Sequence, residues 1–237
     1  MTSQKGQVLL LPSPIGNETP DEFPKSAILA FKRLQYFAVE NIRTTRRWMK
    51  QIDKSINIDQ LVFFELNKHT DEQEMQTFLE PVNRGFDLGI VSEAGCAGIA
   101  DPGAELVRLA HRQQIVVTPH VGPSSILLAL MGSGMNGQQF KFHGYLPIKK
   151  PAVSTTLKNI ANVLSKADET QIFIEAPYRN NGLFEHLLNA MPNHLSLCIA
   201  CNLNTEEQYI LTKSIGAWKK SKKPDLHKKP TVFLIGR

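Results

Sequence analysis

LGIVSEAGCAGIADPG, residues 88–103, joins an apolar run to a loop rich in glycine, alanine and proline. The apolar run is typical of a buried strand, and a helical pattern starts directly after the loop. In a parallel sheet, the loops that leave the carboxyl ends of the strands meet at one edge, where ligands bind. This stretch therefore predicts an α/β fold with a binding site at the end of a strand.

Four other loops of similar composition also follow apolar runs. In chain order, the five are the first loop PSPIGN (12–17), the second loop ENIRTT (40–45), the third loop SEAGCAGIADPG (92–103), the fourth loop PHVGPSS (119–125) and the fifth loop EAPYR (175–179). Their shared position after a strand predicts that all five line one pocket.

Strands and helices alternate along the first half of the chain. Strands are predicted at 8–11, 36–39, 61–66, 88–91 and 115–118, and helices at 24–34, 45–52, 71–84 and 104–112. This alternation predicts a mostly parallel sheet with flanking helices.

The prolines and the glycine of the fourth loop interrupt this pattern. We expect a boundary there, between an N-terminal α/β domain of residues 1–118 and a C-terminal α/β domain of residues 119–237. In the second domain, helices are predicted at 125–131, 153–165 and 181–190, and strands at 141–144, 171–174, 196–200, 208–212 and 231–235. Because two strands follow each other directly after residue 195, the second sheet is expected to be mixed.

With 237 residues, 42% of them hydrophobic, the chain is long enough to bury a large core. The longest uncharged apolar stretch, around 126–131, has about ten residues, against roughly 20 for a membrane span. The first five residues lack the apolar segment of a secretory signal, which predicts a cytoplasmic protein. The three cysteines are too few for a disulfide framework and are expected to be reduced thiols.

Charge is distributed unevenly along the chain. The formal net charge is −2 for residues 1–118 and +7 for residues 119–237. Seven of the 14 positive charges in the second region are lysines within 213–229. This cluster is either the electrostatic footprint of a polyanion such as RNA or a solvated loop whose lysines aid solubility.

Two motifs that are associated with cofactors or metals do not fit their context. The run GSGMNG (132–137) matches a dinucleotide fingerprint, but it follows a predicted helix and precedes a strand, which favours a helix end and a turn. Cys198 and Cys201 form a CxxC motif within a predicted strand, where residues three apart point to opposite faces. The histidines show no ligand spacing, so no metal site is predicted.

Several loop residues have both a structural and a functional interpretation. The prolines of the first loop fit a stiff wall for an uncharged or cationic ligand better than a phosphate cradle, because proline has no N–H group. A rigid connecting turn is the alternative. Asp101 is expected to be the N-cap of the next helix, with Pro102 at the first helical position. Glu175 and Arg179 form either an internal ion pair or a ligand contact.

Together, these loops resemble the motifs of the tetrapyrrole methylase superfamily, and within it those of the ribosomal RNA small-subunit 2′-O-cytidine methyltransferase branch. The family motifs TPIGN, SDAGTPLISDPG, GPSALL, FEGFLP and EAPHR correspond here to SPIGN (13–17), SEAGCAGIADPG (92–103), GPSSIL (122–127), FHGYLP (142–147) and EAPYR (175–179). The resemblance covers residues 8–236 and keeps the order of the motifs.

The resemblance implies an S-adenosylmethionine-dependent methyltransferase with two α/β domains, the cofactor in the cleft between them, and a homodimer. Its implied substrate is a ribose of small-subunit ribosomal RNA, so RNA is the expected partner. Carried over position by position, the expected cofactor-binding residues are Pro14, Ile15, Gly95, Cys96, Ile99, Ser124, Ser125, Ala176 and Leu203. Apolar walls and backbone carbonyls, which these loops offer, suit a sulfonium cation.

A ribose hydroxyl is a poor nucleophile until a base accepts its proton. Glu40 matches the first acid of the family motif EDTR and is the expected base, with Arg43 orienting it or holding a phosphate; surface ion pairing is the alternative for both. The second acid of that motif is Asn41 here, and the family's RELTK reads CNLNT at 201–205. These departures leave two alternatives open: methylation of a small molecule such as a tetrapyrrole, and a non-catalytic relative that binds RNA or a partner.

Overall fold

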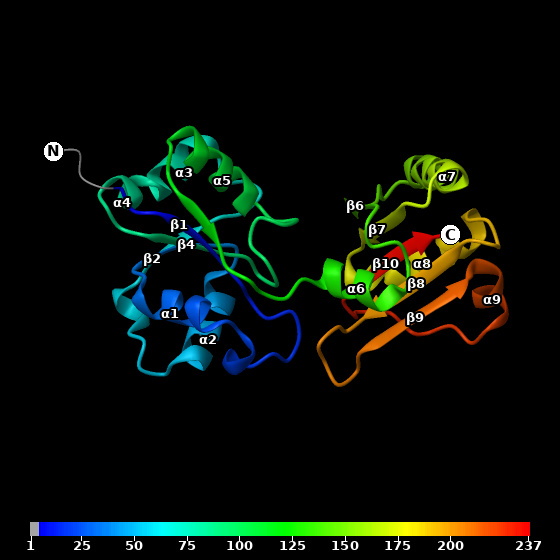
Figure 1. Cartoon of the computed structure of the whole chain (residues 1–237), viewed down its shortest axis with the longest axis horizontal. Coiled ribbons are helices and arrows are strands. Elements are labelled where there is room, and N and C mark those ends of the chain that lie inside the picture. Colours follow the sequence, from blue (N-terminus) through cyan, green and yellow to red (C-terminus); the bar gives the residue numbers. More distant parts are fainter. Residues whose placement is uncertain (1–4) are drawn as a thin grey trace. The chain divides into compact units, whose positions relative to one another are not determined.

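The computed structural model describes residues 5–237, and for Lys150 the backbone only. The chain forms two compact units, Met1–Ser124 and Ser125–Arg237 (Figure 1). The domain boundary between residues 118 and 119 remains a prediction. Residues 1–4, on which the predicted cytoplasmic location partly rests, lie outside the described residues.

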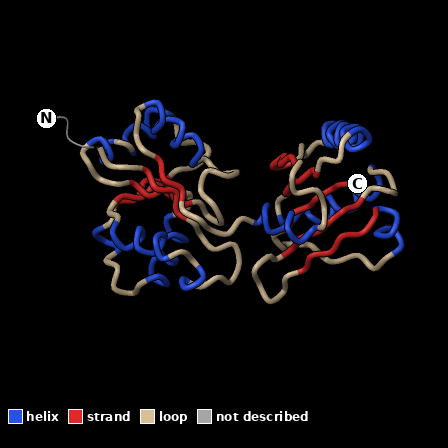
Figure 2. Tube along the Cα trace, viewed as in Figure 1, coloured by secondary structure: helices blue, strands red, loops and turns tan. Residues whose placement is uncertain are grey.

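The first unit is built on a five-stranded sheet in which all neighbouring strands are parallel (Figure 2). The strands are β1 (Val8–Leu11), β2 (Tyr36–Val39), β3 (Val62–Glu65), β4 (Leu88–Val91) and β5 (Val117–Pro119), in the order β3-β2-β4-β1-β5. Because they run in the same direction, their carboxyl ends lie at one edge of the sheet, as the sequence predicts.

Helices cover both faces of this sheet. They are α1 (Lys25–Arg33), α2 (Ile42–Ile52), α3 (Glu72–Phe78), α4 (Glu80–Asn83) and α5 (Gly103–Arg112). Side chains alternate along β1, so that Leu9 and Leu11 pack in a core with α1 and α2, whereas Val8 packs in a second core with α3, α4 and α5. The two faces of the sheet therefore each hold a separate core.

Three predicted elements of the first unit differ from the observed ones by more than one residue. Helix α2 starts three residues earlier, because the side-chain oxygen of Asn41 caps it by accepting a hydrogen bond from Thr44 N at 3.1 Å. The helix predicted over 71–84 is divided at Leu79 into α3 and α4, and Pro81, which has no N–H group to donate, lies in the first turn of α4. Strand β5 starts at Val117, two residues later than predicted.

The second unit contains a mixed five-stranded sheet in the order β6-β7-β10-β8-β9, which confirms the prediction. Its strands are β6 (Phe140–Tyr145), β7 (Thr170–Ile174), β8 (Ser196–Cys201), β9 (Tyr209–Ser214) and β10 (Thr231–Gly236). Strand β10 is antiparallel to both β7 and β8, and β8 is antiparallel to β9, whereas β6 and β7 are parallel.

The helices of this unit are α6 (Ser125–Ser133), α7 (Lys150–Lys166), α8 (Asn180–Ala190) and α9 (Ile215–Lys220). Helices α7, α8 and α9 contribute to one large core, and α6 packs against β8, β9 and β10. Helix α9 lies at the start of the lysine cluster, where the sequence analysis predicts no helix. Ser214 caps it, and the fully buried Trp218 fixes it by donating from its indole N–H to Leu197 O at 2.8 Å. Within residues 5–237, no helix is both long enough and apolar enough to cross a bilayer.

Candidate functional site

Backbone hydrogen bonds join the first loop to the third loop. Ser13 N donates to Gly95 O at 2.9 Å, and Gly95 N donates to Ser13 O at 3.1 Å. Gly95 has a φ of +77°, and a β-carbon at this position would lie 3.3 Å from both Ile15 Cγ2 and Pro123 O. Glycine therefore permits both the backbone conformation and the close approach of the loops.

The fourth loop completes this wall. The Cys96 thiol donates to Pro123 O at 3.3 Å, and burial raises the pKa of this thiol, which keeps it protonated. Gly122 lies directly against Pro12, because a β-carbon at Gly122 would be only 2.1 Å from Pro12 Cβ. The first, third and fourth loops thus contact one another at the carboxyl edge of the sheet.

The second loop contacts the third loop through Glu40. The Glu40 carboxylate accepts a hydrogen bond from Glu93 N at 2.9 Å, and the Asn41 amide donates to Glu93 Oε1 at 3.5 Å. Arg43 is exposed in the first turn of α2, and no ion pair joins it to Glu40 within the described part of the chain. All four predicted loops of the first unit are therefore linked at one edge.

Asp101 braces the third loop from within. Its carboxylate accepts hydrogen bonds from Gly98 N at 2.9 Å and from Gly103 N at 2.6 Å. Helix α5 begins at Gly103 with Pro102 as its N-cap, so the prediction that Asp101 is the N-cap is wrong by one residue. Burial raises the pKa of the Asp101 carboxyl, because the charged form loses solvation that the two N–H groups only partly replace.

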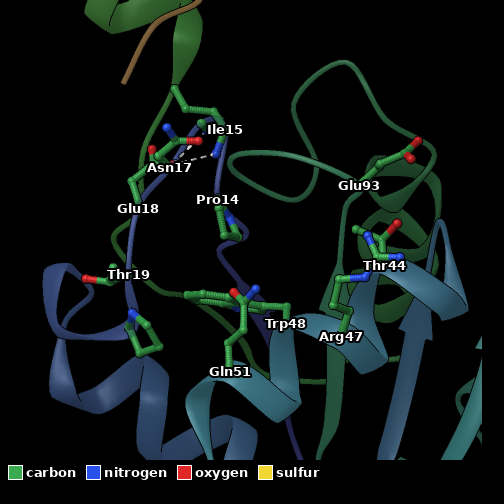
Figure 3. Close-up of a pocket in the computed structure, with 12 residues that line it drawn as sticks. Pro14, Ile15, Asn17, Glu18, Thr19, Thr44, Arg47, Trp48, Gln51 and Glu93 are labelled. Atoms are coloured by element: carbon green, nitrogen blue, oxygen red, sulfur yellow. Dashed lines mark hydrogen bonds between the residues drawn. The ribbon is translucent and has the colours of Figure 1, made fainter. Parts of the chain in front are cut away.

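A cavity of about 570 Å³ lies between the first loop and α2 (Figure 3). We call it the α2 cavity. One wall is the segment from Pro14 to Pro20, in which the Glu18 carboxylate accepts hydrogen bonds from Ile15 N at 3.1 Å and Gly16 N at 2.7 Å. The other wall is one face of α2, formed by Thr44, Arg47, Trp48 and Gln51. Glu93 of the third loop also lines this cavity.

Two further cavities lie at the same edge. An acidic cavity of about 650 Å³ is lined by carboxylate residues together with Lys68; the acids are Glu40, Glu93, Asp101 and Glu105. An apolar cavity of about 390 Å³ is lined by Cys96, Ile99 and His120, among others. Because Glu93 lines both the α2 cavity and the acidic cavity, the Glu40–Glu93 contact lies where these two cavities meet.

The fifth loop belongs to the second unit, where it follows β7 and contains a short 3-10 helix, Pro177–Arg179. The Arg179 guanidinium forms an ion pair with Glu175, and Ala176 N donates to the same carboxylate at 2.7 Å. Of the two interpretations of Glu175 and Arg179, the internal ion pair is therefore present. It fixes the conformation of the loop around Ala176.

The motifs that did not fit their context have structural roles. Gly134 follows the end of α6 with a φ of +71°, as expected for a helix end rather than a dinucleotide loop. Cys198 and Cys201 are buried free thiols on β8, and burial raises the pKa of both. Among the residues that the structure describes, no group of three or more histidines, cysteines and acids could hold a metal ion.

Six predicted cofactor residues lie on the linked loops of the first unit: Pro14, Ile15, Gly95, Cys96, Ile99 and Ser124. Ile99 lines the apolar cavity, and Ser124 ends this unit. The other three lie in the second unit: Ser125 starts α6, Ala176 lies in the fifth loop, and Leu203 is buried in the loop between β8 and β9. All nine assignments, like those of Glu40 and Arg43, stay predictions.

Two features of this edge were missing from the sequence analysis. Glu93 links the second and third loops by a backbone contact, which no residue pattern reveals. The face of α2 that lines the cavity does have a sequence signal, because Thr44, Arg47, Trp48 and Gln51 follow the spacing i, i+3, i+4, i+7.

Comparison with solved structures shows the fold. The chain superposes on the methyltransferase CobJ with a TM-score of 0.65 and 15% identity, over 98% of this chain and 94% of that one. It also superposes on uroporphyrin-III C-methyl transferase from Thermus thermophilus, complexed with S-adenyl homocysteine, with a TM-score of 0.57 and 15% identity, over 98% of both chains. No protein-family model matches the chain.

Curated relatives share more sequence. The chain is 29% identical to ribosomal RNA small subunit methyltransferase I of Vibrio cholerae over 82% of this chain and 64% of the relative, and 32% identical to that of Micromonospora olivasterospora over 87% and 62%. It thus spans just under two thirds of the length of these two. The Halalkalibacterium halodurans protein of the same name is 30% identical over 86% of this chain and 67% of the relative. The chain therefore belongs to the ribosomal RNA small subunit methyltransferase I family.

Proposed function

We propose that this protein is an S-adenosylmethionine-dependent methyltransferase that modifies the 2′-oxygen of a ribose in small-subunit ribosomal RNA. The observation that carries the proposal is the set of direct contacts that link four loops at the carboxyl edge of one parallel sheet. Ser13–Gly95 joins the first and third loops, and Glu40–Glu93 joins the second and third loops. This edge is where α/β folds bind ligands. The names of the curated relatives support methyl transfer to small-subunit ribosomal RNA, and the family resemblance supplies the methyl donor and the 2′-oxygen as acceptor.

The residues of the first unit fit the cofactor. The carbonyl oxygens of Gly122 and Pro123 both lie within 3.6 Å of the Cys96 sulfur, so partial negative charge gathers beside a predicted contact residue. Ile15 packs closely against Gly95, where a β-carbon would lie 3.3 Å from Ile15 Cγ2, and so adds an apolar wall. Carbonyl oxygens and apolar walls attract and enclose a sulfonium group, and the absence of a phosphate cradle agrees with that choice.

When bound, S-adenosylmethionine supplies a methyl group whose bond to sulfur breaks as its bond to the ribose oxygen forms. Glu40 acts as the base and accepts the proton of the 2′-hydroxyl. Its hydrogen bond from Glu93 N fixes one carboxylate oxygen and leaves the other available to a hydroxyl group. Arg43, which is exposed beside it, holds a phosphate of the RNA.

The proposal includes RNA as the partner and a homodimer as the working state, both taken from the family resemblance. The lysines of the second unit support RNA as the partner, because segment 213–229 concentrates positive charge. Sedimentation of the purified chain tests the oligomeric state.

Transfer of a labelled methyl group to small ribosomal subunits, isolated from a strain that lacks this protein, tests the function. Label should appear in 2′-O-methylated nucleotides. Replacement Glu40→Gln should lower kcat by about 100-fold or more, because general base catalysis contributes roughly 10²–10⁴, while the Kd of S-adenosylhomocysteine stays within about twofold. Binding of S-adenosylhomocysteine without any transfer would instead identify a non-catalytic relative.

A further inference from the structure

Arg47 is a cation without a partner in the α2 cavity. It makes no hydrogen bond or ion pair with any residue that the structure describes. Two other cations on the helix are engaged: the Arg46 guanidinium lies 5.1 Å from the centre of the Phe63 ring, and Lys50 Nζ donates to Ile56 O at 2.7 Å. Arg43, in the first turn, does not line the cavity. Arg47 is therefore available to bind an anionic group in the cavity.

The remaining walls of the α2 cavity suit a flat, partly polar ligand. Pro14 and Pro20 provide rigid apolar surfaces on one side, and Trp48 lies on the opposite wall, 4% exposed and packed on Phe23 with ring centres 4.9 Å apart. Gln51, one helical turn further along, adds an amide that can donate and accept. A volume of about 570 Å³ accommodates one nucleotide.

Carboxylates elsewhere in the cavity disfavour a simple anion. Glu93 lines the cavity near the start of α2, where its carboxylate accepts a hydrogen bond from the Asn41 amide at 3.5 Å, and the Glu18 carboxylate accepts from the amides of Ile15 and Gly16 (Figure 3). Both acids repel a free phosphate ion and accept hydrogen bonds from hydroxyl or amino groups. The favoured ligand therefore carries its negative charge at one end, beside Arg47, and donor groups at the other.

We propose that the α2 cavity binds one nucleotide of the RNA substrate, with Arg47 on its phosphate and with the Glu93 side of the cavity on its sugar and base. This inference rests on the proposed function and extends it to a named RNA subsite. Glu93 also contacts Glu40, so a nucleotide in this cavity lies next to the expected base. The cavity would thus fix the position of the RNA chain relative to Glu40.

Trp48 permits a binding test that does not need methyl transfer. The chain has two tryptophans, and the other, Trp218, is fully buried in the core of the second unit. Titration of the full chain with cytidine 5′-monophosphate should change the Trp48 fluorescence. Cytidine and inorganic phosphate should each bind at least about 10-fold more weakly, because each lacks one of the two groups that the cavity selects. Equal affinity for inorganic phosphate and the nucleotide would overturn the assignment.

Neighbouring arginines on α2 provide matched variants. Replacement Arg47→Ala should raise the Kd of the nucleotide and the KM for small ribosomal subunits by about 10- to 100-fold, as expected for the loss of a charge-assisted contact. Replacement Arg47→Lys should give Kd and KM values between those of the native chain and those of Arg47→Ala, because lysine keeps the charge but not the bidentate geometry. Replacement Arg46→Ala removes the same charge outside the cavity and should change both values by less than about twofold.

The Kd of S-adenosylhomocysteine should be unchanged in all three variants. Equal effects of Arg46→Ala and Arg47→Ala would show general charge attraction and overturn the proposal. A chain that binds the nucleotide through Arg47 but transfers no methyl group would keep the subsite and remove the proposed reaction, so the two failures are distinguishable.

Discussion

The two units differ in where their loops go. In the first unit every strand is parallel to its neighbours, so the loops after β1, β2, β4 and β5 meet at one edge and hydrogen-bond to one another. In the second unit β10 is antiparallel to both of its neighbours, which sends successive loops to opposite ends of the sheet. Direction of pairing, rather than loop composition, therefore decides which unit can build a site from several loops.

Packing differs in the same way. The first unit divides its apolar side chains between two cores on opposite faces of its sheet, whereas the second has one large core of buried residues that reaches from α7 to α9. In the first unit, the loops hydrogen-bond to one another outside these cores. In the second unit, Trp218 anchors the last helix inside the core. Paired substitutions, one in each unit, test this comparison.

The largest expected difference concerns the two tryptophans. Replacement Trp218→Phe removes the buried hydrogen bond to Leu197 O and some volume, and should lower the free energy of unfolding by about 2–3 kcal/mol. Replacement Trp48→Phe removes an indole N–H group that has no hydrogen-bond partner, so it should cost only about 1 kcal/mol. Urea unfolding followed by circular dichroism measures both, and a larger loss at Trp48 would contradict the comparison.

A pair of glycines gives a smaller effect on ligand affinity. Gly95 and Gly144 both have positive φ, +77° and +66°, so alanine strains the backbone at either position by roughly 1–2 kcal/mol. Only Gly95 has neighbours within 4 Å of an added β-carbon, Ile15 and Pro123. Calorimetry should therefore show about 10-fold weaker S-adenosylhomocysteine binding for Gly95→Ala and an unchanged Kd for Gly144→Ala.

One result would contradict the expected cofactor contact at the linked loops. An unchanged Kd for Gly95→Ala, in a variant that still folds, would show that the junction of the first and third loops lies outside the cofactor site.

Much of the fold could be predicted from the sequence, because apolar runs and helical spacing are local signals. Strands β1, β2 and β4 begin and end where predicted. Helix α9 is not predicted because it is short and followed by lysines. Its two anchoring residues, Ile215 and Trp218, are buried through contacts such as Trp218 with Leu197, which the local sequence does not indicate.

The candidate site was less accessible from the sequence. Composition singled out the loops, but their links depend on which strands are neighbours in the sheet: Glu40 reaches Glu93 only because β2 pairs with β4. Backbone contacts such as Ser13–Gly95 leave no side-chain pattern to detect. Motifs therefore identified the edge of the sheet, and three-dimensional pairing decided which residues share a cavity.

The smallest expected effect separates two aspartates by the sign of their pH dependence. Burial raises the pKa of Asp101 in the first unit, so the folded chain holds this proton more tightly than the unfolded chain, and stability falls as pH rises from 3.8 through the raised pKa. A hydrogen bond from Asn181 lowers the pKa of Asp225 in the second unit, so the stability from this group is present above its ordinary pKa and is lost as pH falls through the lowered value.

Replacement by asparagine removes each titration. Asp101→Asn keeps an oxygen for the N–H groups of Gly98 and Gly103 and should cost about 1 kcal/mol or less near pH 3, and the variant should gain stability relative to the native chain as pH rises. Asp225→Asn should instead lose stability relative to the native chain as pH rises from acidic to neutral, because only the native chain gains from ionisation of Asp225. Urea midpoints measured from pH 3 to pH 7 distinguish the slopes. If the urea midpoints of Asp101→Asn and of the native chain changed in parallel with pH, Asp101 would be solvated in the folded chain. The third loop would then be less tightly braced than its hydrogen bonds indicate.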